Sequence, residues 1–220
     1  DYNPNSNRYF LRTAKDLRKD QSYFIYRLQQ EQLAKILLPL GEYSKPQIRE
    51  LAHQAGLKVY DKPDSQDFYS GDYSDLLEVK ANPGNFVTKD GRILGRHTGI
   101  WNYTIGQRRG LGVSSERPLY VIGFNKEKNE VILGHEEESL KKGLLAGNCT
   151  WMDFELPTKP FTATAKVRSS QTPTPVTVSK TEKGIKVEFI DLQKALTPGQ
   201  SIVLYNGDII LGGGIIDEIL

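Results

Sequence analysis

The N-terminal part of the chain carries apolar positions at helical spacing. Residues 21–38 contain no Gly or Pro, and Phe24, Leu28 and Leu33 fall on one predicted face. Asp20 stands where an N-cap residue would. We therefore expect one amphipathic helix over residues 21–38.

A second helix is marked by its start. Ser44 and Gln47 have the spacing of a capping box, and Pro46 falls in the first turn, where its missing N–H is harmless. We then expect a short strand at residues 57–60 and a third short helix at residues 73–79. Because so few elements make a thin core, this part is expected to complete a larger domain.

From about residue 84 the pattern changes to short apolar stretches separated by tight turns. Asp90 with Gly91, and again Asn206 with Gly207, are dipeptides typical of two-residue hairpins. Strands at such short intervals are typical of small antiparallel barrels, and a change of composition near residues 139–148 divides the region into two modules. The expected strands are residues 85–89, 92–95, 119–124, 130–134, 162–168, 176–179, 185–190, 201–205 and 209–211.

Composition supports a folded protein and does not by itself select a partner. Of 220 residues, 38% are hydrophobic and 25% charged, which excludes a disordered tail. The formal net charge of +2 excludes a uniformly basic coat protein. Three stretches are nevertheless basic: residues 8–19 hold a single acid, and residues 91–115 and 156–181 hold none. They either converge into a face that binds a polyanion or are ordinary solvated surface.

The residues that most often carry chemistry are few. The single cysteine, Cys149, excludes an intrachain disulfide and a Cys-x-x-Cys metal site. It stands in an apolar, strand-like run, which favours a buried small side chain over a nucleophile. The three histidines lack metal-ligand spacing, so no metal site is predicted. No apolar run reaches the roughly 18 residues of a membrane span and no signal peptide opens the chain, so we expect a soluble, cytoplasmic protein without a membrane partner.

Lys19, Asp20 and Gln21 form a polar cluster beside the first basic stretch. The start of a helix attracts phosphate through its free amides and its dipole, Lys adds a charge, and Gln can hydrogen-bond a base edge. A plain capping segment is the alternative interpretation.

Gln107, Arg108 and Arg109 form a second cluster among the glycines of residues 104–112. Glycines let a backbone turn sharply, and Gln and Arg suit recognition of phosphates or bases. The segment is not a Walker loop, because no Lys-Ser/Thr pair follows its last glycine. A third segment, residues 197–200, ends on Gln200 and is followed by the glycines of residues 212–214; barrel geometry is the alternative explanation for both.

These motifs belong to an ordered series of blocks, namely residues 19–24, 41–49, 64–66, 104–112, 197–201 and 205–216. Together they resemble the central and C-terminal parts of the bacterial tRNA-specific 2-thiouridylases. The resemblance takes in nearly all 220 residues. The ordered series and the block around Gln107 are specific to this family. Any other block taken singly would not be.

The resemblance implies an α+β architecture in three parts. Residues 1–69 would be the helical end of an N-terminal ATP-pyrophosphatase α/β domain, residues 70–142 a small, mostly-β central domain, and residues 143–220 a C-terminal antiparallel β-barrel. It also implies that ATP, with Mg²⁺, adenylates the C2 oxygen of the wobble uridine in tRNA, after which a persulfide from a sulfur-donor protein supplies the sulfur. The family's nucleotide-binding loop and first catalytic cysteine have no counterpart here, so we expect a chain that lacks the N-terminal region.

The resemblance carries site residues over by motif. It places tRNA contacts at Lys19, Asp20, Gln21, Arg168, Ser169 and Gln200. Most of these lie in or beside two of the three basic stretches. To them we add Gln107, Arg108 and Arg109 from the glycine-rich segment.

Tyr69 occupies the place of the family's second catalytic cysteine. A phenol cannot carry a persulfide, so no catalytic residue is assigned within this chain. Either the parent protein uses another thiol, upstream or on a donor protein, or it is a tRNA-binding relative that has lost thiolation. A generic β-barrel interaction module is a third, weaker hypothesis, supported by the strand pattern alone.

Overall fold

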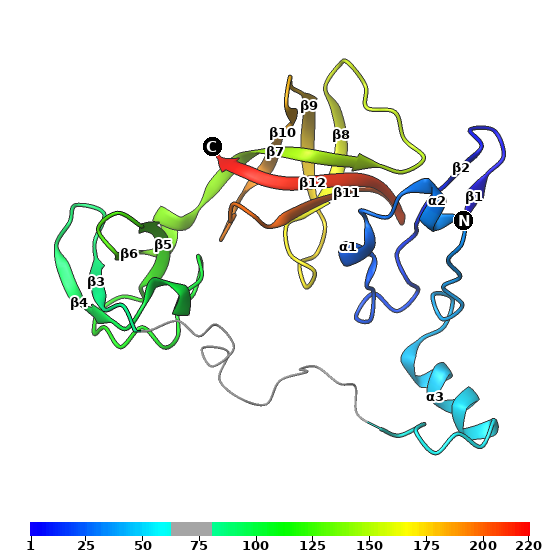
Figure 1. Ribbon diagram of the computed structural model, residues 1–220, viewed down its shortest axis with the longest axis horizontal. Helices are drawn as coiled ribbons and strands as arrows, with labels where there is room; N and C mark the ends of the chain where they lie inside the picture. The colour runs from blue at the N-terminus through cyan, green and yellow to red at the C-terminus, as the bar shows by residue number, and fades with distance from the viewer. Residues whose placement is uncertain (63–80) are drawn as a thin grey trace. The chain divides into compact units, whose positions relative to one another are not determined.

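A computed structural model describes residues 1–62 and 81–220 of the chain (Figure 1). These residues pack into two compact units. Unit 1 comprises Asp1–Pro63, Lys142–Asp191 and Thr197–Leu220, and unit 2 comprises Asp64–Lys141 and Leu192–Leu196. The expected helix at residues 73–79 and the position of Tyr69 lie outside the described residues.

Unit 1 is built around a closed six-stranded barrel in which neighbouring strands are antiparallel, with the order β10-β7-β12-β11-β8-β9. Inward side chains alternate with outward ones, as in β9, where Val176 and Val178 are buried. The predicted C-terminal antiparallel barrel is therefore confirmed. The strands are β7 (Lys141–Trp151), β8 (Phe161–Lys166), β9 (Thr174–Lys180), β10 (Gly184–Gln193), β11 (Ser201–Asn206) and β12 (Ile209–Ile219).

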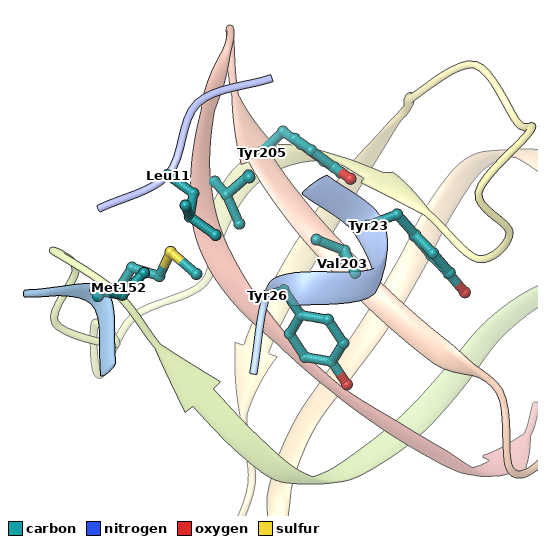
Figure 2. Close-up of a cluster of buried hydrophobic side chains, with 8 residues drawn as sticks. Leu11, Tyr23, Tyr26, Met152, Val203 and Tyr205 are labelled. Carbon is teal, nitrogen blue, oxygen red and sulfur yellow. The ribbon is translucent and has the colours of Figure 1, made fainter. Parts of the chain in front are cut away.

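The N-terminal segment packs against this barrel. Its elements are β1 (Tyr2–Asn3), β2 (Arg8–Tyr9), α1 (Ser22–Ile25) and α2 (Gln30–Leu33). Arg12 pairs with Ile209 at the start of β12, so the segment joins the barrel by backbone as well as by side chains. A shared apolar cluster lies between them (Figure 2), made of Leu11, Tyr23, Tyr26, Leu33, Met152, Val203, Tyr205 and Ile210.

The single helix expected over residues 21–38 is wrong, because the segment forms two short helices. Gln29 has an extended backbone (φ −84°, ψ 164°) and forms a capping box with Gln32, which starts α2 afresh. The break lets Tyr26 turn into the apolar cluster, where it is 2% exposed. Asp20 is not the N-cap either, since Gln21 holds that position without a side-chain bond.

Helix α3 (Lys45–Gln54) begins where its cap predicts. The Ser44 amide donates to Gln47 Oε1 at 2.9 Å, so the capping box is confirmed. None of the residues of α3 is buried, and Leu51 is 48% exposed. The strand expected at residues 57–60 is wrong: Tyr60 N bonds to Leu57 O at 3.3 Å, which makes a turn.

Unit 2 is a four-stranded sheet of order β4-β3-β6-β5. The Asp90–Gly91 hairpin between β3 and β4 is confirmed, and Gly91 has the positive φ of +88° that this turn needs. The described residues of unit 2 form an open sheet and no closed antiparallel barrel, since β3 pairs with β6 in parallel. The elements are β3 (Gly84–Val87), β4 (Ile93–His97), η1 (Ile100–Asn102), β5 (Tyr120–Asn125), β6 (Glu130–Gly134) and η2 (Glu136–Ser139).

The core of unit 2 consists of Phe86, Leu111, Val121, Val131 and Leu133. His97 is also buried, and its ring meets those of Phe86 and Tyr103 edge-on. Burial lowers the pKa of His97, so its imidazole is a neutral part of the core. Within the described part of the chain, no helix is long and apolar enough to cross a membrane.

Gly213 in β12 determines how closely Tyr26 approaches the barrel. A Cβ at this position would overlap the carbonyl oxygen of Ile202 and lie 3.0 Å from the Tyr26 ring. We predict that Gly213→Ala lowers the free energy of unfolding by about 1–3 kcal/mol through overpacking. Denaturant unfolding would measure this.

Gly41→Ala is the matched control in the same unit. A Cβ there meets only the carbonyl oxygen of Leu38, at an ordinary 3.5 Å. We expect its effect to stay within about 0.5 kcal/mol. Equal stability of the two variants would contradict the proposed packing limit at Gly213.

Candidate nucleic-acid interface

Tyr23 joins three segments of unit 1 that are far apart in the sequence. Its hydroxyl lies 3.0 Å from the carbonyl oxygen of Val167 and 2.9 Å from that of Ser201. Burial raises the pKa of Tyr23 to about 12, so the hydroxyl stays protonated and donates to these two carbonyls. The predicted contact residues directly flank this junction: Lys19 to Gln21 precede Tyr23, Arg168 and Ser169 follow Val167, and Gln200 precedes Ser201.

The barrel itself brings the second and third segments together. In the antiparallel pair of β8 and β11, Val203 faces Lys166. Because the Tyr23 hydroxyl bonds to the carbonyls of both Val167 and Ser201, the segment that follows β8 lies next to the start of β11. The charge of Arg168 is close enough to Tyr23 to oppose the effect of burial on its pKa.

Tyr26 strengthens the same junction. Its hydroxyl donates to Ser201 Oγ at 3.1 Å, while its ring lies in the apolar cluster (Figure 2). Tyr23 lies in α1 and Tyr26 caps its C-terminus, so this four-residue helix is fixed to the barrel by two hydrogen-bonded rings. This arrangement positions the polar residues that come just before α1.

Asp20 is used inside the protein. Its carboxylate accepts hydrogen bonds from Ala14 N at 3.0 Å, from Ser22 N at 3.2 Å and from Ser22 Oγ at 2.7 Å. These bonds shape the turn that presents Lys19 and Gln21, both of which are exposed. The geometry favours a positioning role for Asp20.

Exposed positive charge lies around this junction. The cationic Lys19 and Arg168 are exposed, and the Arg18 side chain is 89% exposed. The neutral side chain of Gln200, another of the predicted contacts, is also exposed. The nearest acid to Arg18 is Asp16, at 3.8 Å, and the amide of Lys45 holds the pKa of that carboxyl below its usual value. We call the surface formed by Lys19, Gln21, Arg168, Ser169 and Gln200 the barrel-edge surface.

The glycine-rich segment of unit 2 forms a separate basic loop. Gly106 N bonds to Val121 O at 2.8 Å and Val121 N to Gln107 O at 2.9 Å, so the loop is tied to β5. The Gln107 side chain closes the loop, accepting from Thr104 N at 3.0 Å and donating to Arg109 O at 2.9 Å. Arg108 and Arg109 remain exposed. Gln107 therefore organises the loop, and its two arginines are the groups that face solvent.

Cys149 lacks the surroundings of a reactive thiol. Burial raises its pKa to about 11, and the carboxylate of Asp217 adds to the shift. Its Sγ donates a weak hydrogen bond to the carbonyl of Ala146 at 3.7 Å. A thiol that stays protonated at neutral pH is a poor nucleophile, as its apolar sequence context predicted.

The structure adds one residue that the sequence motifs did not single out. Tyr23 lay within the expected helix at residues 21–38 without an assigned role, yet it is the residue that connects the three segments. Its partners are backbone carbonyls, which any residue type supplies, so no sequence signal could have paired them. Phe24 was expected on a packed face and is instead 60% exposed.

Comparisons with known proteins match nearly the whole chain, one part after another. Three family models fit consecutive parts: the tRNA methyl transferase HUP domain over residues 2–69, the tRNA methyl transferase PRC-barrel domain over residues 75–135, and the aminomethyltransferase beta-barrel domain over residues 141–216. This series defines the class, a protein with the three-domain organisation of the tRNA methyl transferase models.

Relatives with the name tRNA-specific 2-thiouridylase MnmA narrow this class. The protein of Endomicrobium trichonymphae is 46% identical over 218 residues, that of Clostridium botulinum strain Alaska E43 44% over 221, and that of Koribacter versatilis 41% over 227. These alignments take in 97–98% of this chain and 61% of each relative, so the chain spans about three fifths of their length. The chain belongs to the tRNA-specific 2-thiouridylase family.

The raised pKa of Cys149 predicts slow alkylation. At pH 8 the folded chain should react with iodoacetamide roughly two orders of magnitude more slowly than free cysteine, because little thiolate is present. In denaturant the same chain should reach the rate of free cysteine. Mass spectrometry of the alkylated protein over time measures both rates, and a fast reaction of the folded chain would contradict the assignment.

Proposed function

We propose that this chain is the tRNA-binding portion of a tRNA 2-thiouridylase. The observation that carries the proposal is the junction at Tyr23. It gathers the segments containing Lys19, Arg168 and Gln200, which the family resemblance assigns to tRNA independently of any geometry. The three segments that carry these predicted contacts therefore adjoin at one edge of the barrel, which supports the proposal.

The chemistry of the barrel-edge surface suits an RNA backbone with unpaired bases. Lys19 and Arg168 supply positive charge for phosphates, and the guanidinium of Arg168 can hold two phosphate oxygens at once. Gln21, Ser169 and Gln200 can donate to and accept from base edges or the ribose 2′-hydroxyl. Arg108 and Arg109 offer the same phosphate chemistry on unit 2.

The whole reaction that we propose for the parent protein is thiolation of C2 of the wobble uridine. ATP with Mg²⁺ would supply adenylation of the C2 oxygen, and a persulfide on a sulfur-donor protein would supply the sulfur. The described residues fit neither ATP nor a persulfide. The Gln107 side chain bonds across the glycine-rich loop where a triphosphate would need room, and Cys149 is protonated. The described residues thus hold tRNA in this proposal and carry no step of the sulfur chemistry.

A tRNA-binding relative without thiolation is the second candidate. It is favoured by one observation, Tyr69 at the place of the family's second catalytic cysteine. A chain of this kind would keep the barrel-edge surface and bind tRNA without modifying it. The two candidates therefore agree on RNA binding and differ on the fate of the wobble uridine.

Charge reversal tests the proposed surface. Lys19→Glu and Arg168→Glu should each weaken binding of unfractionated tRNA roughly 10-fold or more, because each removes a charge-assisted phosphate contact. Each should also make the slope of log affinity against log salt concentration shallower by about 1. Fluorescence anisotropy across a salt series gives both quantities.

Lys183→Glu is the matched control, since Lys183 is exposed on the same unit and lies outside the proposed surface. It should keep the parent affinity within about threefold, a difference of well under 1 kcal/mol. If all three variants bind alike, the barrel-edge surface does not bind tRNA.

We propose that this chain binds tRNA and carries no step of the sulfur chemistry, which predicts the activity of the 220 residues alone. They should bind tRNA, and they should neither hydrolyse ATP nor thiolate tRNA. Mass spectrometry of tRNA from cells that lack the full-length gene then separates the two candidates. Loss of the 2-thio group identifies the enzyme in spite of Tyr69, whereas an unchanged level identifies the relative without thiolation.

A further inference from the structure

Phe24 is an exposed aromatic residue on an otherwise buried element. In α1, Ser22 and Tyr23 are buried, and the adjoining Tyr26 is 2% exposed. Phe24 is 60% exposed. Since the tyrosines take the inward face of α1, the helix holds the Phe24 ring outward.

The ring of Phe24 is held in place by a rigid neighbour. It meets the Tyr23 ring edge-on, with centroids 5.4 Å apart and planes at 88°. Tyr23 is itself fixed by the carbonyls of Val167 and Ser201. A T-shaped contact restrains a ring and covers at most one of its faces, and with 60% of Phe24 exposed a face remains for another partner.

The surroundings of Phe24 are basic. The exposed Lys19 comes shortly before it in the chain, Arg27 follows at an exposed position, and Arg168 lies close enough to Tyr23 to act on its pKa. Two acids lie nearby in this segment: Asp20 accepts hydrogen bonds from Ala14 and Ser22, and Asp16 accepts one from the Lys45 amide. An aromatic face among cations is the arrangement that proteins use for single-stranded nucleic acid, in which the cations hold phosphates and the ring stacks on a base.

We propose that Phe24 is the stacking platform for an unpaired nucleobase of the bound tRNA. This inference rests on the proposed function and adds a residue that reads the single-stranded character of the RNA. The surrounding cations favour RNA, a polyanion, over an apolar protein partner, because covering charged side chains with an apolar surface costs free energy. Because the stack involves a ring face and no phosphate, it contributes affinity that salt does not screen.

The test compares Phe24→Leu with Phe24→Trp in the 220-residue chain. Leucine keeps an apolar side chain and loses the ring, whereas tryptophan keeps a stacking face. The probes are an RNA hairpin with a single-stranded loop and a blunt RNA duplex. Tyr2→Leu serves as the matched control, since Tyr2 is an aromatic residue of the same unit, 47% exposed and outside the barrel-edge surface.

We expect Phe24→Leu to weaken binding of the hairpin roughly 5- to 150-fold, the range that stacking of one base on an aromatic ring supports. Binding of the duplex, the salt dependence and the melting temperature should not change. Phe24→Trp should bind the hairpin like the parent. A 2-aminopurine in the loop should be quenched by the parent chain and by Phe24→Trp, and quenched less by Phe24→Leu.

The outcomes separate this proposal from the one on which it rests. If Phe24→Leu binds the hairpin like the parent while Lys19→Glu binds it weakly, the surface holds RNA and the stacking role is wrong. Equal loss of hairpin and duplex binding would also overturn it, because stacking requires an unpaired base. If the parent chain binds neither probe, the proposed function itself fails.

Discussion

The hydroxyl of Tyr23 is the interaction on which the candidate interface depends. A phenol has one hydrogen, and here two carbonyls share it, the buried one of Val167 and the part-buried one of Ser201. Both carbonyls lie just outside the β8–β11 ladder, where the next strand no longer supplies a donor. Loss of the hydroxyl would take this donor from the buried Val167 carbonyl, at a cost of about 1–3 kcal/mol. One side chain therefore completes the barrel edge and attaches α1 to it.

This attachment explains why the first residues of the chain belong to the same compact unit as the barrel. The four-residue α1 is too short to be stable by itself, so its conformation comes from the rings of Tyr23 and Tyr26 in the shared core. Gly213 makes room for the second ring. The position of Lys19 in space is thus set by residues almost two hundred positions later in the chain.

The parts of the fold that the sequence predicts are those with local causes. The capping box at Ser44 and the hairpins at Gly91 and Gly207 depend on neighbouring residues alone, and all three are found. The break after Tyr26 and the parallel pairing of β3 with β6 depend on contacts made far along the chain. Nothing within residues 21–38 indicates that Tyr26 must turn into the barrel, so the periodic pattern predicted one helix.

The candidate site, too, could be predicted from the sequence only in part. Residue type predicted charge and hydrogen-bonding capacity correctly, but it could not show which groups the protein uses for itself. Asp20 and Gln107 have polar side chains that could contact a ligand. Both instead form hydrogen bonds within the turns in which they lie. The groups that face outward include the cations, the polar Gln21 and Gln200, and the ring of Phe24. In the proposed function the cations attract the polyanion through charge and the ring distinguishes single strands from duplexes through stacking, so affinity and selectivity would come from different side chains.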